Sequence, residues 1–151
     1  MEGLEMRAEE LMIGDYVAIV EPDDYKGYNG EVRIINSITN YVTVAFPFKT
    51  HDVFCDDLKP ISLTPEILEK NGFKKENGGK IMGFNIADSY ELVYQGRTNF
   101  DKFWIYIQDF GESKKWHIKI NGHFDISGFI NDVHELQHAL KLCGIDKQIV
   151  L

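Results

Sequence analysis

Short strand-like runs separated by turn residues recur along most of this chain, and they limit its fold more than any other feature. In the first third of the chain these runs fall at residues 16–20, 31–35, 41–46 and 53–55. Their β-branched and aromatic residues favour strands, and Asn29-Gly30 favours a tight turn because it tolerates positive φ. Several short strands joined by close turns predict a small β-barrel.

The rest of the chain predicts a mixed α and β lobe. Thr64 is a suitable helix cap, Pro65 fits the first helical position, and Asn71-Gly72 predicts the end of this short helix. A turn is expected at residues 76–79. Strand-like runs then follow at residues 81–86, 91–94, 102–108 and 116–120.

A longer helix is expected over residues 127–143, with Ser127 as its cap and Gly144 as its stop. At about 100° per residue, one narrow apolar stripe contains Phe129, Val133, Leu136, Leu140 and Cys143. This stripe would cover one face of the antiparallel sheet. The predicted class is therefore α+β, with an N-terminal SH3-like barrel lobe at residues 1–62 and an α+β lobe at residues 63–151.

The N-terminal spacing resembles the KOW family of SH3-like barrels. The features that carry the resemblance are Gly14-Asp15-Tyr16-Val17, Lys26-Gly27, Gly30-Glu31-Val32 and Asp57-Leu58-Lys59-Pro60. They cover about a third of the chain. Because KOW modules occur in ribosomal proteins and transcription-elongation factors, the resemblance implies nucleic-acid association as one function.

Most of the chain from Met6 onward is similar to a set of uncharacterised small proteins from anaerobic gut bacteria and their mobile elements. The similarity rests on residues 8–14, on residues 60–66 continuing to Gly72-Phe73, and on residues 133–137 continuing to Ala139-Leu140. No activity comes with this resemblance. Those proteins are expected to carry Asn at the position that His138 occupies here.

The charge of the chain is unfavourable for polyanionic partners. The formal net charge is −8, and residues 1–62 hold 12 acidic and 5 basic side chains. Phosphate binding needs lysine and arginine to displace counterions, so the composition disfavours nucleic acid and anionic lipid. Lys26, Arg33, Lys49 and Lys59 could still cluster on one face of the barrel.

The segment His134-Glu135-Leu136-Gln137-His138 matches H-E-x-x-H, in which two histidines on one helix bind zinc and Glu acts as a general base. A catalytic zinc site needs a third protein ligand, and after His138 only Asp146 offers a carboxylate. His117 or His123 could supply a third nitrogen. On the helical wheel His134, Glu135 and His138 fall opposite the apolar stripe, so they are predicted to face water rather than a shielded cleft.

An acidic and aromatic loop provides the best candidate for binding. Tyr25 and Tyr28 could line a groove for an extended peptide, and Asp23 and Asp24 could pair with a basic residue of that peptide. The alternative is an ordinary solvated turn. Strand edges in so small a sheet also allow self-association.

Several other functions have no sequence support. The chain lacks P-loop, dinucleotide-binding, nucleophile-elbow and EF-hand motifs, so no catalytic residue, metal or cofactor is predicted. Cys55 and Cys143 are expected to be reduced, buried thiols. Without a secretory leader or an apolar run near the ~18 residues of a membrane span, a cytoplasmic location is expected.

The predicted function is a non-enzymatic binding or accessory protein that recognises another protein through its acidic SH3-like lobe. The alternative is a KOW-type nucleic-acid-associated module. A zinc-dependent hydrolase using His134 and His138 is the third hypothesis.

Overall fold

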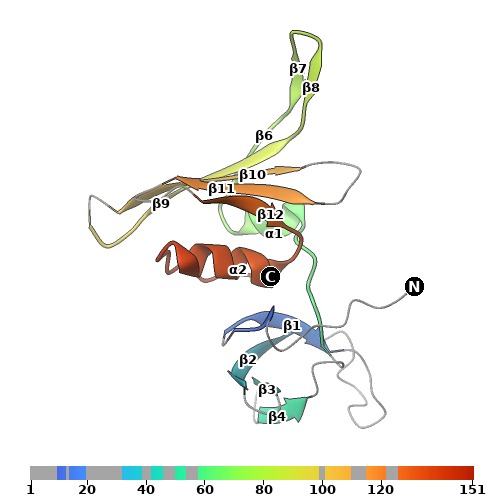
Figure 1. Cartoon of the computed structure of the whole chain (residues 1–151), viewed down its shortest axis with the longest axis vertical. Coiled ribbons are helices and arrows are strands. Elements are labelled where there is room, and N and C mark those ends of the chain that lie inside the picture. Colours follow the sequence, from blue (N-terminus) through green and yellow to red (C-terminus); the bar gives the residue numbers. More distant parts are fainter. Residues whose placement is uncertain are drawn as a thin grey trace. The chain divides into compact units, whose positions relative to one another are not determined.

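The computed structural model describes residues 10–12, 14–19, 32–38, 42–45, 50–53, 58–98, 101–109, 115–121 and 126–151. The chain forms two compact units. One comprises residues 1–62 and 132–134, and the other comprises residues 63–131 and 135–151. Among the described residues, sheets and two helices occur together, so the class is α+β (Figure 1).

The first unit contains a five-stranded antiparallel sheet. Its strands are β1 (Tyr16–Ile19), β2 (Val32–Ile38), β3 (Val42–Ala45), β4 (Thr50–Val53) and β5 (Leu58–Lys59). The strand order is β4-β3-β2-β1-β5, so four successive strands form a meander and β5 returns to pair with β1. Within the described part of this unit, β4 and β5 are the two sheet edges and the sheet does not close into a barrel.

A tight turn before β1 is held by Gly14 and Asp15. Gly14 has a φ of 91°, a conformation that a side chain would disfavour. The buried Asp15 carboxylate accepts a hydrogen bond from the Met12 N–H at 2.7 Å. The Gly14 N–H donates to the Ile35 carbonyl of β2, and the Asp15 carbonyl accepts from the Ile35 N–H. This local network explains why a Gly-Asp pair opens the first strand.

In the second unit, helix α1 (Pro65–Lys70) confirms the prediction for this segment. The Thr64 hydroxyl caps the helix by accepting from the Ile67 N–H at 3.3 Å. Pro65 occupies the first turn, and Gly72 ends the helix with a φ of 84°.

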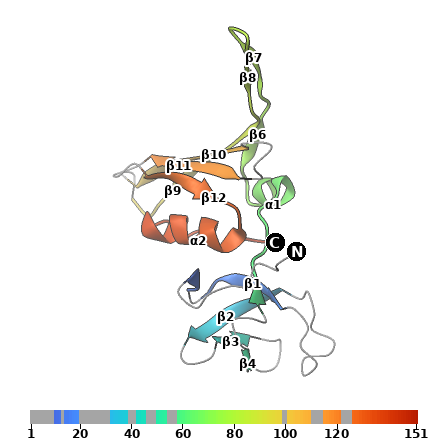
Figure 2. The ribbon, with the colours of Figure 1, turned by 45° about the vertical axis from the view of Figure 1, so that its right-hand side comes forward.

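The second unit is built on another five-stranded antiparallel sheet. In the order β12-β11-β10-β9-β6, the strands are β12 (Ile126–Ile130), β11 (Trp116–Asn121), β10 (Lys102–Asp109), β9 (Ser89–Gln95) and β6 (Lys74–Glu76). Alternate residues of its strands face a buried layer that contains Tyr90, Phe103, Ile105, Ile107, Trp116, Ile118 and Ile120. Helix α2 (Val133–Leu142) lies along this face of the sheet in both views (Figures 1 and 2).

The predicted helix over residues 127–143 is wrong in its first part. Residues 126–130 form β12 and pair with β11, so Ser127 is a strand residue and Phe129 is exposed. The apolar spacing from Phe129 to Leu140 crosses a strand-helix boundary, which a helical wheel cannot detect. Gly144 does end α2, with a φ of 72°. Neither helix in the described residues is long and apolar enough to span a membrane.

Candidate interaction surface

The predicted groove residues Asp23, Asp24, Tyr25 and Tyr28 lie outside the described residues. The same holds for Cys55, Lys26 and Lys49. Of the other two basic residues predicted to cluster on the barrel lobe, Arg33 lies in β2, and Lys59 lies in β5 with its side chain exposed. The peptide groove therefore stays a prediction.

One residue of the H-E-x-x-H segment is placed differently from the prediction. His134 is only 6% exposed, whereas it was expected to face water. The buried side of α2 includes polar His134 and Gln137 as well as Leu136 and Leu140. It is therefore wider than the apolar stripe predicted from the helical wheel. Glu135 accepts a hydrogen bond from the Asn131 N–H at 2.6 Å and so links the first turn of the helix to the segment that precedes it. Among the described residues, no three His, Cys, Asp or Glu side chains are grouped to hold a metal.

A hairpin arm, defined as residues 79–86, is the most exposed apolar feature of the described chain. Its strands are β7 (Gly79–Ile81) and β8 (Phe84–Ile86). The arm extends from the sheet of the second unit in both ribbon views (Figures 1 and 2). The prediction of a single strand at residues 81–86 is wrong, because a turn at Met82-Gly83 divides it.

The arm continues the ribbon formed by β6 and β9 without a change of register. Lys74 pairs with Glu91 in the sheet, and Gly79 pairs with Ile86 in the arm. The same number of residues separates these pairs on both strands. The arm is therefore an extension of the β6-β9 ribbon beyond the paired part of the sheet.

The tip of the arm is a tight two-residue turn. Met82 has a φ of 51° and Gly83 has a φ of 85°. Positive φ at both central residues matches the right-handed twist of a hairpin. Met82 is the only non-glycine residue with positive φ in the described chain, and an unbranched side chain tolerates this conformation better than a β-branched one.

The base of the arm is fixed by Asp88. One carboxylate oxygen accepts from the Gly78 N–H at 2.8 Å, and the other lies 2.8 Å from the Lys75 ammonium. The hydrogen bonds from Lys75 and then from Gly78 lower the pKa of Asp88, and the hydrogen bond to Asp88 raises the pKa of Lys75. Both groups are charged at neutral pH and separate the apolar arm from the buried layer around Tyr90.

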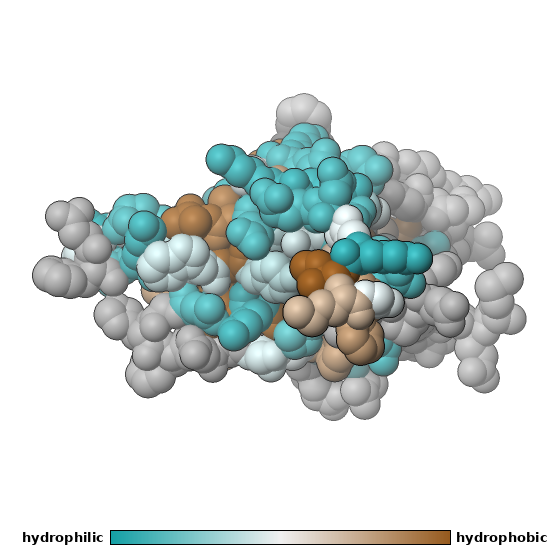
Figure 3. All heavy atoms as spheres, turned by 90° about the horizontal axis from the view of Figure 1, so that it is seen from above, coloured by the Kyte–Doolittle hydropathy of each residue, from teal (hydrophilic) through white to brown (hydrophobic). Residues whose placement is uncertain are grey.

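The two sides of the arm differ in polarity. Lys80 pairs with Asn85 on one side, whereas Ile81 pairs with Phe84 and Gly79 with Ile86 on the other. Ile81 is 60% exposed, Phe84 75% and Ile86 39%, and Met82 at the tip is 94% exposed. Figure 3, which looks onto the tip, shows brown and tan spheres gathered at the arm and teal spheres over much of the surface beside it. Such an apolar cluster is a candidate binding surface.

The sheet face that α2 leaves uncovered carries a smaller apolar group. Val93 pairs with Trp104 there, and both side chains are about half exposed. Lys102 lies over the Trp104 ring at 5.0 Å from its centroid. Glu91 and Lys119 flank Tyr106 in the neighbouring row. This alternation of charged and aromatic residues is typical of a solvated sheet face.

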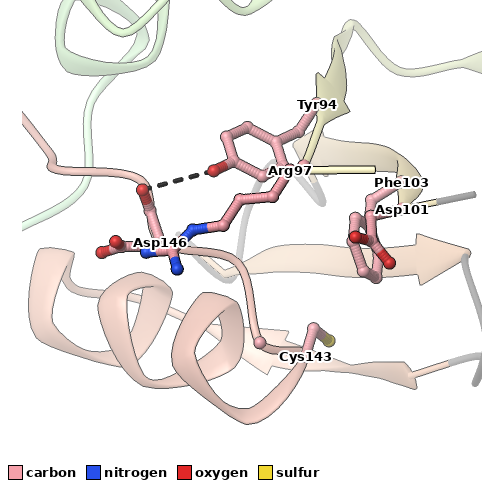
Figure 4. A pocket seen from close by; sticks show the side chains of 8 residues that line it. Tyr94, Arg97, Asp101, Phe103, Cys143 and Asp146 are labelled. Atoms are coloured by element: carbon pink, nitrogen blue, oxygen red, sulfur yellow. Dashed lines mark hydrogen bonds between the residues drawn. The ribbon is translucent and has the colours of Figure 1, made fainter. Parts of the chain in front are cut away.

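A cavity of about 400 Å³ lies between the β9-β10 turn and the end of α2 (Figure 4). Its lining consists of Tyr94, Gly96, Arg97, Asp101, Phe103, Cys143, Gly144 and Asp146. The Asp101 carboxylate is engaged by the N–H and hydroxyl of Thr98. Burial raises the pKa of the Cys143 thiol, so it stays protonated at neutral pH and is a weak nucleophile. These observations favour a structural role for Asp101 and Cys143.

Sequence reasoning identified residues 81–86 of the arm as strand formers and placed Gly79 in a turn, but it did not identify an exposed surface. The available signal was the pattern Ile81-Met82-Gly83-Phe84-Asn85-Ile86, in which glycine follows two apolar residues and polar Asn85 interrupts the run. No protein-family model, curated protein or solved structure matches this chain.

Proposed function

We propose that this chain is a non-enzymatic binding protein that recognises another protein through the hairpin arm. The observation that carries the proposal is the apolar side of the arm, formed by Ile81, Phe84 and Ile86 and left open to solvent. A two-stranded hairpin is marginally stable in water without a further layer, so an apolar partner surface would both bind the arm and stabilise it.

The chemistry of the second unit supports a binding role rather than catalysis. Glu135 is engaged at the start of α2, and Cys143 is a protonated thiol. The arm, in contrast, groups four exposed apolar side chains in one short segment: Ile81, Met82, Phe84 and Ile86. Large exposed apolar groups on a protein surface mark interaction sites more often than reaction centres.

For the first unit we propose an SH3-like barrel of the KOW type, in a member of the set of gut-bacterial proteins that the chain resembles. The support is the strand order β4-β3-β2-β1-β5, a meander whose last strand returns to the first. In this proposal the loop with Asp23, Asp24, Tyr25 and Tyr28 forms a second binding surface, and the protein acts in the cytoplasm.

The test is affinity capture with the full chain from cells in which it naturally occurs. The double variant Ile81→Thr/Phe84→Thr replaces the apolar side of the arm with strand-compatible polar residues. Lys80→Thr/Asn85→Thr makes the same change on the opposite side of the same strands and is the matched control. The proposal expects a protein partner that the first variant loses and the control retains.

Two outcomes would contradict this assignment. If both variants retained the partners of the wild-type chain, the arm would be excluded as the binding surface. Loss of those partners in Tyr25→Ala/Tyr28→Ala would place binding in the N-terminal lobe. Failure of any protein, including a second copy of this chain, to bind the wild-type chain would contradict the function itself. Circular dichroism of each variant verifies that the second unit still folds.

A further inference from the structure

We propose that the partner of the arm is a second copy of this chain, with the apolar sides of two arms packed against each other about a two-fold axis. This inference rests on the proposed role of the arm as a protein-binding surface and names its partner. A two-fold contact uses the same patch on both copies, so the patch must be complementary to itself.

The distribution of charge makes the apolar side self-complementary. Lys80 is the only charged residue among residues 79–86, and the pairing of Lys80 with Asn85 places it on the opposite side from Ile81 and Phe84. Two arms can therefore meet through Ile81, Phe84 and Ile86 without bringing like charges together. In that arrangement each Lys80 stays in water.

The Lys75–Asp88 pair limits how far the contact extends. Both side chains lie at the base of the arm, and both are partly exposed to solvent. Burying this ion pair under a second copy would cost desolvation energy. The expected contact therefore covers residues 79–86 and ends before Asp88.

The exposed area fits a weak dimer. With ~200 Å² for each fully exposed side chain of this size, the exposed fractions of Ile81, Met82, Phe84 and Ile86 amount to roughly 500 Å² per arm. Complete burial of these four side chains in both arms would remove at most about 1,000 Å² from water, near the lower limit for a specific interface. The expected dissociation constant is about 1 µM to 1 mM.

Sedimentation equilibrium of the purified full chain between about 1 µM and 1 mM measures this association. The wild-type chain and the control Lys80→Thr/Asn85→Thr should show the same concentration-dependent dimer. Ile81→Thr/Phe84→Thr should weaken the dimer at least about tenfold, because it removes most of the apolar side of the arm. The variants should have the same unfolding temperature as the wild-type chain when all are measured as monomers.

An isotope-filtered nuclear Overhauser experiment tests the geometry. In a mixture of labelled and unlabelled wild-type chain, we expect contacts between Phe84 of one copy and Ile81 or Ile86 of the other. Intermolecular contacts outside residues 79–86 would overturn the arm-to-arm arrangement.

The outcomes separate this inference from the proposed function. A wild-type chain that stays monomeric over the whole range overturns the second copy as partner, as does a dimer that Ile81→Thr/Phe84→Thr leaves unchanged. In either case an arm-dependent protein recovered by affinity capture would still support the proposed function. If capture yields no other protein and the dimer depends on the arm, self-association is the binding activity.

Discussion

The side-chain amide of Asn71 forms two hydrogen bonds with the backbone of Val150. Its Nδ2 donates to the Val150 carbonyl oxygen at 2.7 Å, and its Oδ1 accepts from the Val150 N–H at 2.8 Å. The same Nδ2 also donates to the Ile67 carbonyl at 2.8 Å. Asn71, which is buried at the end of α1, thus attaches the C-terminal segment to this helix. The side chains of Ile145 and Ile149 in that segment are buried.

Asn71→Ala is expected to lower the free energy of unfolding by about 2–3 kcal/mol, because it removes three part-buried hydrogen bonds to the backbone of Val150 and Ile67. Asn85→Ala, on the exposed arm, should change it by less than about 0.5 kcal/mol. Urea unfolding measures both values. Equal effects of the two substitutions would contradict the role of Asn71, and faster hydrogen exchange at Val150 in Asn71→Ala would support it.

Replacement of the two tryptophans should have unequal effects on stability. The Trp116 ring is 8% exposed, donates from Nε1 to the Leu63 carbonyl at 3.2 Å and lies edge-on to Tyr90, whereas Trp104 is 50% exposed. Trp116→Phe should cost about 2 kcal/mol because it leaves a buried carbonyl without its donor. Trp104→Phe should cost less than about 0.5 kcal/mol. Chemical denaturation followed by circular dichroism compares them, and the reverse order would contradict the assigned faces of the sheet.

Gly78 and Gly79 form a matched pair for testing the base of the arm. A Cβ at Gly78 would lie 1.9 Å from the Ile86 carbonyl oxygen and 2.6 Å from the Ala87 carbonyl carbon, whereas a Cβ at Gly79 meets no atom within 4 Å. Gly78→Ala should therefore reduce hydrogen-exchange protection of residues 79–86 by about tenfold or more. Gly79→Ala should leave it within about twofold. Unchanged protection in Gly78→Ala would show that the Gly78 backbone does not lie against Ile86 and Ala87.

The pKa of Asp88 should lie below the ordinary aspartate value of about 3.9, because Lys75 and the Gly78 N–H hydrogen-bond to the ionised form. A group whose pKa falls on folding stabilises the native state above its unfolded pKa, and this contribution is lost as the pH falls through the folded pKa. The arm should therefore loosen in acid. A carboxyl-resolved NMR titration measures the pKa, which should rise in Lys75→Ala and stay unchanged in Lys80→Ala.

The two histidines of the H-E-x-x-H segment should behave as structural residues. Because His134 is buried and His138 is half-buried, His134→Ala should lower stability by roughly 1–3 kcal/mol, more than His138→Ala does. Metal analysis of the purified protein is expected to detect less than about 0.1 zinc per chain, whereas a zinc site would hold nearly one. Stoichiometric zinc that both substitutions abolish would instead support the hydrolase hypothesis.

Local chemistry determined much of the secondary structure. Thr64, Pro65 and Gly72 define α1 because capping and backbone preferences act over a few neighbouring residues. Strands β10 and β11 follow their β-branched and aromatic runs for the same reason. The mixed α+β class was predictable at this level.

Contacts between segments distant in the sequence determined the features that local sequence preferences could not predict. Residues 126–130 form a strand because β11 offers them a pairing edge, although the apolar spacing into α2 suggests a longer helix. His134 is buried although the wheel places it opposite the apolar stripe, because burial depends on what surrounds a helix as well as on its own sequence. Residues 79–86 become an exposed surface because their register carries the ribbon beyond the sheet, and only the tertiary structure determines where an apolar side chain lacks a cover.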